Sequence, residues 1–262
     1  ALMKGRRGLV MGVANDHSIA WGIARILAAQ GAELAFTYQG EDFGKRVEPL
    51  AQSVGSSLVL PCDVEDSATV DKVFERLGNE WGKIDFLVHA IAYSDKEELK
   101  GRYAETTRDN FIRTMVISCF SFTELVRRAA DLMPDGGSAL TLTYGGSTKV
   151  MPNYNVMGVA KAALEASVRY LASDYGGEGI RVNAISAGPM RTLAGAGITG
   201  ARAMYAFQKR HSPLRRTVSL VAVGGSALYL LSPVSGGVTG AVLYVDAGYN
   251  ILGMPEPPES WE

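Results

Sequence analysis

The chain has 262 residues, of which 47% are hydrophobic and 20% are charged, and its formal net charge at pH 7 is −1. This length and composition suit one α/β domain with a large core. The near-neutral charge gives no reason to expect nucleic acid or an anionic membrane as a partner. The apolar runs fall short of the roughly 18 residues that a membrane span requires.

Short apolar runs typical of strands alternate with longer helical patterns along the whole chain. The predicted strands are Gly8–Gly12, Leu34–Tyr38, Leu58–Leu60, Phe86–His89, Ser138–Thr143, Ile180–Ile185 and Val242–Val245. The predicted helices are Ile19–Gln30, Gly44–Ser53, Ala68–Glu80, Asn110–Met133, Tyr154–Tyr175 and Val218–Leu231. This alternation predicts a single Rossmann-type, doubly wound α/β domain over residues 1–262, with a seven-stranded parallel sheet flanked by helices.

The two ends of the chain carry smaller expectations. The apolar stretch Gly8–Val13 follows two arginines, as in a signal peptide, but it is short and no small-residue cleavage site follows it. We therefore interpret it as the first strand. The tail Met254–Glu262 contains three prolines and is predicted to be an extended arm.

Cysteine and histidine are few. Cys62 and Cys119 have no paired spacing, and a reducing compartment, the cytoplasm, is the simplest interpretation for both thiols. The three histidines lie far apart and near no Cys or acidic residue at ligand spacing; they are His17, His89 and His211. We therefore predict no dedicated metal site.

The first predicted strand runs into a glycine turn and then a helix. Gly12 ends the strand, Ser18 stands at an N-cap position, and Ile19 begins the helix. This order suits a dinucleotide site, because glycine lets the backbone approach a pyrophosphate and a helix N-terminus offers free N–H groups. Ser18 is placed to cap the helix or to contact phosphate. The turn lacks the G-x-G-x-x-G pattern, so an ordinary strand-to-helix turn is an equal alternative.

The next two strand ends fit an adenosine site. Gln39 follows the second strand, where an Asp or Glu would hold the ribose and an Arg would favour a 2′-phosphate. Because Gln39 supplies no cation, NADH is favoured over NADPH. Asp63 and Val64 follow the third strand and are placed to border the adenine. The alternative for Asp63 is a helix cap.

Tyr154 and Lys161 stand seven residues apart at the start of a predicted long helix. Seven residues at about 100° each overshoot two turns by only about 20°, so both side chains return to nearly the same face. Helical side chains lean toward the N-terminus, which directs the Lys161 arm toward Tyr154. A phenol beside an ammonium, near a nucleotide fold, predicts proton or oxyanion chemistry coupled to hydride transfer. The alternative is a surface lysine and a half-buried aromatic on an ordinary helix.

Five segments in the second half of the chain carry its most specific pattern. They are Tyr144-Gly145-Gly146, Pro152–Gly158, Ala160-Lys161-Ala162, Arg181–Pro189 and Arg191–Ala194. Together with the glycine turn they resemble the bacterial enoyl-acyl carrier protein reductases of the short-chain dehydrogenase superfamily, and the resemblance runs from Gly12 to Gly248. Most of the superfamily has Tyr-x3-Lys, and Asn-Ala-Gly after the fourth strand. This chain has Tyr-x6-Lys and His89-Ala90-Ile91, and the enoyl reductases share both departures.

The resemblance implies catalytic roles for two tyrosines and one lysine. Tyr154 donates a hydrogen bond to the enolate oxygen, and Lys161 binds the ribose hydroxyls. Tyr144 is a second active-site tyrosine, which donates a proton or only orients the substrate; an aromatic in the pocket wall is the alternative. The backbone at Ser94 contacts the acyl substrate. With the strand ends described above, the predicted cofactor-binding residues are Gly12, Ser18, Ile19, Gln39, Asp63, Val64, Ile91, Lys161, Met190, Arg191, Thr192, Leu193 and Ala194.

Residues 190–210 are predicted to form a mobile substrate flap. By the resemblance, Met190–Ala194 lies along the nicotinamide and the diphosphate. Gly195, Gly197 and Gly200 make a poor helix. We favour a flap that orders over the cofactor and the acyl chain, because an apolar substrate needs a cover that opens. A surface loop without a gating role is the alternative.

The Tyr-x6-Lys spacing has a chemical interpretation. In enoyl-thioester reduction the hydride adds at C3, whereas negative charge collects on the C1 oxygen. The phenol must therefore lie farther from the nicotinamide than in a ketoreductase. Moving the tyrosine from four to seven residues before the lysine shifts it by about 4.5 Å along a helix.

The resemblance implies NADH-dependent reduction of the C2=C3 double bond of trans-2-enoyl-acyl carrier protein thioesters to saturated acyl thioesters, the last step of the fatty-acid elongation cycle. It also implies acyl carrier protein as a partner and a homotetramer. Two alternatives stay open: another short-chain reductase, such as a β-ketoacyl carrier protein reductase, and a non-catalytic relative that binds NAD as a sensor or scaffold. The Tyr-x6-Lys spacing argues against the first, and the presence of Tyr154 and Lys161 argues against the second.

Overall fold

The computed structural model describes residues 1–192, 195 and 199–256, and its centre is a single seven-stranded sheet. The strand order is β3-β2-β1-β4-β5-β6-β7, and every neighbouring pair is parallel. The order reverses between β1 and β4, as the doubly wound prediction requires. The strands are β1 (Arg7–Met11), β2 (Glu33–Tyr38), β3 (Leu58–Pro61), β4 (Phe86–His89), β5 (Gly137–Thr143), β6 (Ile180–Ala187) and β7 (Val242–Val245).

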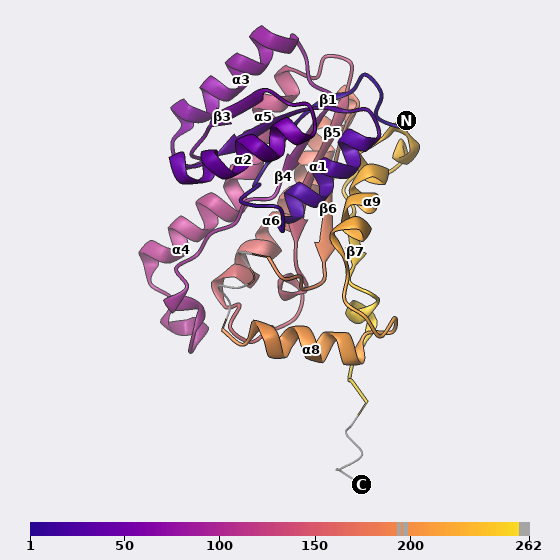
Figure 1. Ribbon diagram of the computed structural model, residues 1–262. Helices are drawn as coiled ribbons and strands as arrows, with labels where there is room; N and C mark the ends of the chain where they lie inside the picture. The colour runs from indigo at the N-terminus through magenta and orange to yellow at the C-terminus, as the bar shows by residue number, and fades with distance from the viewer. Residues whose placement is uncertain (193–194, 196–198, 257–262) are drawn as a thin grey trace.

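Helices cover both faces of the sheet (Figure 1). One face packs against α1, α2 and α9, and the other against α3, α5 and α6. The helices are α1 (Ile19–Ala29), α2 (Glu41–Ser53), α3 (Ser67–Trp81), α4 (Arg108–Met115), α5 (Ser121–Asp131), α6 (Val156–Tyr175), α8 (Ala201–His211) and α9 (Leu220–Leu231). None of these described helices combines the length and the apolar character needed to cross a membrane.

Shorter helical segments connect these elements. A π-helical segment, Val116–Phe120, joins α4 to α5. The 3₁₀ turns are Glu97–Leu99, Tyr103–Glu105, Gly145–Ser147, Gly176–Glu178, Pro233–Ser235 and Tyr249–Ile251.

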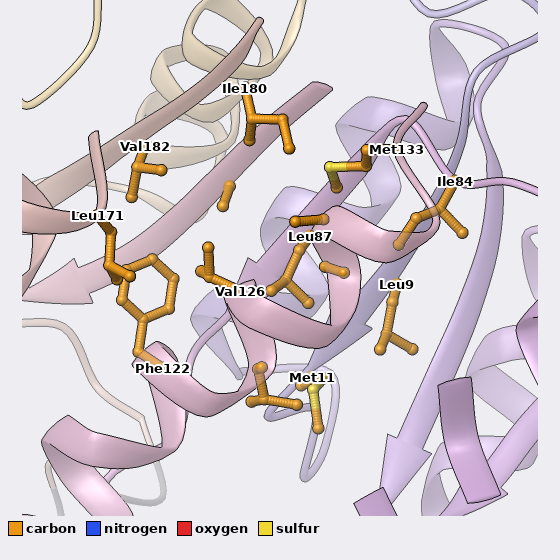
Figure 2. Packing of buried hydrophobic residues seen from close by; sticks show 14 of the residues in the cluster. Leu9, Met11, Ile84, Leu87, Phe122, Val126, Met133, Leu171, Ile180 and Val182 are labelled. Carbon is orange, nitrogen blue, oxygen red and sulfur yellow. The ribbon is translucent and has the colours of Figure 1, made fainter. Parts of the chain in front are cut away.

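The core on the α3–α5–α6 side is built from fully enclosed strand and helix residues. Figure 2 shows Leu9 and Leu87, from neighbouring strands, gathered with Phe122 and Val126 of α5. Val88, the next residue along β4, belongs to the core on the opposite face. Each such side chain stabilises the fold by about 1.5–3 kcal/mol when fully buried. A sheet enclosed on both faces holds its strand ends as rigid anchors for the loops that follow.

The seven predicted strands are confirmed, with bounds within two residues of those observed. The prediction of one continuous helix over 110–133 is wrong, because the π-helical segment interrupts it after Met115. The predicted start of the next long helix at Tyr154 is also wrong. Asn155 has a φ of 43°, which is not helical, so α6 begins at Val156.

The predicted flap and tail are only partly described. Residues 193–194 and 196–198 of the flap, and residues 257–262 of the tail, lie outside the described residues. Within the flap range, α8 forms an ordered helix directly after Gly200, whose φ is 80°. Residues 254–256 form no helix or strand.

Candidate active site

The carboxyl ends of β5, β6 and β7 border a small pocket of about 110 Å³. Open α/β sheets bind their ligands at this edge. In Figure 1, α8 lies across the same end of the sheet, and its Gln208 contributes to the pocket wall. Tyr144 faces the pocket, whereas Tyr154 packs behind it. The lining residues are Tyr144, Gly145, Thr148, Lys149, Met151, Ser186, Ala187, Gly188, Gln208, Tyr244, Asp246, Tyr249 and Asn250.

Two asparagines with positive φ hold the turn that carries Tyr154. The φ of Asn153 is 58° and that of Asn155 is 43°, values that asparagine adopts more readily than most other non-glycine residues. The Asn153 amide donates to the Thr199 carbonyl at 2.9 Å, and the Asn155 amide donates to the Leu99 carbonyl at 3.3 Å. The turn is therefore tied to two other loops.

Glycines make room for the Tyr154 ring. A Cβ atom at Gly146 would lie 2.3 Å from a ring carbon of Tyr154, and one at Gly158 would lie 2.6 Å from the Gly146 carbonyl oxygen. The ring meets Tyr144 edge to face, with centroids 5.0 Å apart. The Gln208 amide donates to the Tyr144 hydroxyl at 3.2 Å. The two tyrosines thus pack as one unit, with Tyr154 buried and Tyr144 half-buried at the pocket, and no motif in the sequence indicated this contact.

Burial raises the pKa of both phenols. For Tyr154 the shift is large, and the neighbouring Tyr144 and Glu165 add to it. For Tyr144 burial is again the main cause, and the hydrogen bond from Gln208 partly offsets it. Both hydroxyls are therefore protonated at neutral pH and able to donate.

Lys161 is buried on the first turns of α6. Its ammonium donates to the carbonyl oxygen of Leu142, near the end of β5, at 2.8 Å. Burial lowers the pKa of Lys161 from 10.5 to about 8. Tyr154 and Lys161 do not share a helix face as predicted, because Tyr154 precedes α6 and its position follows from the asparagine turn. The 4.5 Å shift along a helix, roughly three residues at 1.5 Å each, does not apply to it.

A layer of polar side chains lies between the sheet and the helices near Lys161, where apolar packing is the norm. His89 contacts the Thr141 hydroxyl through Nδ1 and the Ser121 hydroxyl through Nε2, each at 2.8 Å. Ser121 donates its own proton to the Ile117 carbonyl at 2.6 Å, so it accepts from Nε2 and Thr141 donates to Nδ1. Burial, with the charge of Lys161, lowers the pKa of His89 to about 3. His89 is therefore a neutral imidazole with a defined tautomer.

Glu165 belongs to the same layer and was not singled out from the sequence. It is 7% exposed, and its carboxylate accepts from the Thr143 hydroxyl at 2.7 Å. Its position four residues after Lys161 was the available signal, since an acidic residue on the inner face of a helix is rare.

The glycine turn after β1 leaves a helix N-terminus free of side-chain caps. The φ of Gly12 is 105°, and a Cβ atom there would lie 2.0 Å from the Ala90 carbonyl oxygen, so the turn admits glycine alone. Ser18 occupies the N-cap position of α1 but caps no helix amide. Its hydroxyl accepts instead from the amides of Ala14 and Asn15, at 3.0 and 3.1 Å. Ile19 begins the helix, as predicted.

The residues predicted to hold adenosine lie together. The Gln39 amide donates to the Asp63 carboxylate at 3.1 Å. Asp63 also accepts from the Glu65 amide at 2.9 Å. The capping alternative for Asp63 is wrong, because the N-cap of α3 is Asp66. Val64 is partly buried against the core.

The loop after β4 is anchored to the π-helical segment. Ser118 accepts from the Tyr93 amide at 2.9 Å and donates to the Tyr93 carbonyl at 3.0 Å. Ser94 is buried, and its hydroxyl accepts from Thr114 at 2.9 Å and from Asn110 at 3.1 Å. With its hydroxyl engaged inside the protein, Ser94 offers substrate only its backbone. Ile91 packs against the core of the α3–α5–α6 side.

The segment after β6 is partly described. Met190 is half-buried against the core on the α1–α9 side, and the Arg191 guanidinium lies 5.0 Å from the centroid of the Tyr205 ring. The Thr192 hydroxyl accepts from the Gly195 amide at 3.0 Å. The predicted cofactor contacts Leu193 and Ala194 lie outside the described residues.

Comparisons with known proteins agree with this geometry. The profile of the family described as Enoyl-(Acyl carrier protein) reductase matches residues 12–250. Enoyl-(acyl-carrier-protein) reductase (NADH) 2 of Rhizobium meliloti is 72% identical over 254 residues, which cover 97% of this chain and 95% of the relative.

Two solved structures are also similar to this chain. FabI from Candidatus Liberibacter asiaticus has a TM-score of 0.96 at 63% identity, covering 97% of this chain and 99% of the other. The enoyl-(acyl-carrier-protein) reductase from Anaplasma phagocytophilum in complex with NAD has a TM-score of 0.95 at 57% identity, covering 98% of each chain. With its parallel seven-stranded sheet and its two tyrosines and lysine at the carboxyl edge, the chain belongs to the enoyl-(acyl carrier protein) reductase family.

Proposed function

We propose that the protein is an enzyme that uses NADH to reduce the C2=C3 double bond of trans-2-enoyl-acyl carrier protein thioesters, the last step of fatty-acid elongation. The observation that carries the proposal is the packed pair of half-buried Tyr144 and buried Tyr154, with Lys161, at the edge of the sheet where ligands bind. Family membership and the names of the relatives support the substrate class and the cofactor.

The residues around β1 and β2 fit a dinucleotide. The uncapped N-terminus of α1 offers amides and partial positive charge to a pyrophosphate. Gln39 and Asp63 offer an amide and a carboxylate to the adenosine, next to Val64. The proposed contacts on the nicotinamide side are Ile91, Lys161 and Met190–Ala194. When bound, the cofactor supplies the hydride that adds to C3.

The reaction places negative charge on the thioester oxygen, and Tyr154 is proposed to stabilise it. Its hydroxyl stays protonated and donates to that oxygen most strongly as the charge develops. Lys161 is proposed to bind the ribose hydroxyls and to keep the site electropositive. Water is kept from these groups because Tyr154 and Lys161 are each only 7% exposed.

Tyr144 is proposed to orient the substrate. Its oxygen accepts from Gln208, which leaves its own proton free for donation toward the pocket. Ser94 is proposed to contact the acyl chain through its backbone. The acyl thioester would reach these residues through the pocket bordered by α8.

Residues 190–210 are proposed to act as a flap over the bound ligands, within one domain that spans the chain. The support is the position of Gln208, which reaches from α8 to Tyr144, and the Asn153–Thr199 bond, which joins this segment to the Tyr154 turn. Hydrogen exchange of the free enzyme against the complex with NADH and an enolate mimic tests it. We expect added protection over residues 199–208, and equal protection in both states would contradict the proposal.

A homotetramer in the cytoplasm completes the proposal. Exposed large apolar side chains on α4, α6 and α9 suit contacts between subunits, and Phe111, Val159 and Val221 are examples. The buried free thiols of Cys62 and Cys119 suit a reducing compartment. Light scattering on the purified protein is expected to give the mass of four chains, and a monomer at working concentration would contradict this.

Steady-state kinetics test the activity directly. Crotonyl and longer enoyl thioesters are compared with a β-ketoacyl thioester, each with NADH and with NADPH. We expect rapid NADH oxidation with the enoyl substrates alone. Faster turnover of the ketoacyl thioester would assign the other reductase class, and no oxidation with either would indicate a binding protein.

A further inference from the structure

Glu165 is a buried carboxylate for which the proposed reaction has no direct use. It lies on α6 with only 7% of its surface exposed, and the Thr143 hydroxyl donates to its Oε1 at 2.7 Å. A carboxylate removed from water is costly unless it is well partnered or serves another group. Its neighbours Leu164 and Val168 on α6 are apolar and fully buried. The burial of the Glu165 carboxylate therefore indicates a structural or functional role.

The position of Glu165 on its helix directs it toward Lys161. The two residues are four apart on α6, so they share a face one turn apart. Helical side chains lean toward the N-terminus, which brings the Glu165 side chain back over the turn of Lys161. Both side chains form hydrogen bonds to adjacent residues of β5. The Lys161 ammonium donates to the Leu142 carbonyl at 2.8 Å, and Glu165 accepts from Thr143.

These two hydrogen bonds join the last two residues of β5 to α6, directly before Tyr144. The Lys161 bond holds the backbone of Leu142, and the Glu165 bond holds the side chain of Thr143. A displacement of either helical residue would move the strand end from which Tyr144 projects. The two bonds therefore hold Lys161 and Glu165 against the strand end that carries Tyr144.

Among the titratable groups described around Lys161, Glu165 supplies the negative charge. Burial lowers the pKa of Lys161 to about 8, and Cys119 and Glu165 oppose that shift. Cys119, on the π-helical segment, has a pKa raised by burial, so its thiol is neutral when Lys161 titrates. His89, on β4, is neutral above a pKa of about 3. The pKa of Tyr154, before α6, is raised by burial, so its phenol is neutral too.

We propose that Glu165, held by Thr143 one helical turn from Lys161, is a positioning residue that keeps the Lys161 ammonium protonated and directed at the end of β5. The proposal rests on the role assigned to Lys161 in the proposed function. It adds a residue that touches neither substrate nor cofactor and acts through another side chain.

Titration of Lys161 in the apo protein tests the proposal without relying on activity. The protein is labelled with ¹³Cε-lysine, and the resonance missing from Lys161→Ala is assigned to Lys161. Wild type is expected to titrate near the value of about 8. Glu165→Gln removes the negative charge and is expected to lower the midpoint by about one pH unit. Glu165→Asp keeps the charge and should restore most of the shift.

The pH profile of kcat/KM with crotonyl thioester and NADH gives a second readout. In Glu165→Gln the alkaline limb should move to lower pH, while the two proteins converge below about pH 6, where Lys161 is protonated in both. Loss of activity at every pH with an unmoved limb would indicate a merely structural role. Asp174→Asn, an exposed carboxylate on the same helix, is the matched control and should leave both readouts at the wild-type value.

Thr143→Val covers the case in which Glu165→Gln does not fold. It removes the hydroxyl that, among the described residues, donates to Glu165, so the carboxylate is no longer held beside Lys161 and the Lys161 midpoint should move in the same direction. An unchanged midpoint in whichever of the two variants folds would overturn the proposal. Lys161→Ala distinguishes a failure of the role proposed for Lys161 from a failure of the role proposed for Glu165. Unchanged NADH affinity in that variant removes the assigned role of Lys161, whereas weakened affinity with an unmoved Glu165→Gln midpoint removes only the role of Glu165.

Discussion

The two ends of the nucleotide-binding edge of the sheet are built in contrasting ways. At the reaction end, Tyr154 and Lys161 are buried, and three hydrogen bonds join β4, β5 and α6 around them: His89–Thr141, Thr143–Glu165 and Lys161–Leu142. At the adenosine end, exposed Gln39 makes one hydrogen bond to Asp63. Buried groups have shifted pKa values and little freedom, whereas exposed groups are screened by water. Under the proposed function, the first end controls rate, and the second contributes modest affinity and cofactor choice.

The largest effect is expected at Tyr154. Tyr154→Phe removes the hydroxyl that is proposed to donate to the developing charge, so kcat should fall on the order of 10²–10³-fold with little change in NADH binding. Stopped-flow and steady-state kinetics on a short enoyl thioester measure it. Tyr170→Phe, an exposed tyrosine on α6, is the control and should behave as wild type. A near-wild-type kcat for Tyr154→Phe would remove the contrast between the two ends.

Lys161 comes next. Lys161→Ala removes a charged donor and should weaken NADH binding by about 10- to 100-fold, equivalent to about 1.5–3 kcal/mol. Isothermal calorimetry measures this affinity. Lys72→Ala, an exposed lysine on α3, provides the comparison and should leave the affinity unchanged. Equal affinities for all three proteins would confine Lys161 to fastening β5.

Buried His89 at the reaction end is expected to make the stability of the protein depend on pH. The pKa of His89 is lowered by burial from 6.5 to about 3. Between these pH values the unfolded chain therefore binds a proton at His89 that the folded chain does not bind. Neutral His89 therefore contributes stability that is present above about pH 6.5 and lost as the pH falls toward 3. His89→Gln is expected to be less stable than wild type at pH 7. The difference between their free energies of unfolding should decrease by about 1.4 kcal/mol per pH unit on acidification. Urea unfolding from pH 7 to 4 tests this, and a constant deficit would contradict it.

The smallest effect is expected at the adenosine end. NADH should be preferred over NADPH, because Gln39 offers no cation and Asp63 adds a carboxylate beside it. Gln39→Arg should improve the KM for NADPH by less than about 10-fold, since an exposed ion pair contributes at most about 1 kcal/mol. Gln52→Arg on α2 adds the same charge elsewhere and controls for net charge. A lower KM for NADPH than for NADH in wild type would contradict the preference.

The strand pattern was predictable because each central strand is apolar on both faces and flanked by turn residues. Leu9 and Val10 show this, since they enter the cores on opposite faces of the sheet. Helix ends were harder to predict. Nothing in the apolar periodicity marks the residue at which Asn155 takes a positive φ, so α6 was predicted to begin too early.

The candidate site also combines features that could be predicted from the sequence with features that could not. Tyr154 and Lys161 could be picked out from their spacing, but their relation in space depends on the asparagine turn and on the Leu142 carbonyl. Gln208 was out of reach because it approaches Tyr144 across 64 residues of sequence. Such contacts depend on tertiary packing, which local pattern does not encode.

The π-helical segment between α4 and α5 makes this part of the chain intolerant of a change in length. Val116–Phe120 holds one more residue per turn than an α-helix would. Deleting Cys119 or Phe120 would restore α-helical winding and leave Ser118 only two residues before Ser121, so that the two side chains would lie about 200° apart around the helix. Ser118 would then turn away from Tyr93 while Ser121 stayed beside His89. Point substitutions can be absorbed locally, but a single-codon deletion here would separate the loop after β4 from its anchor.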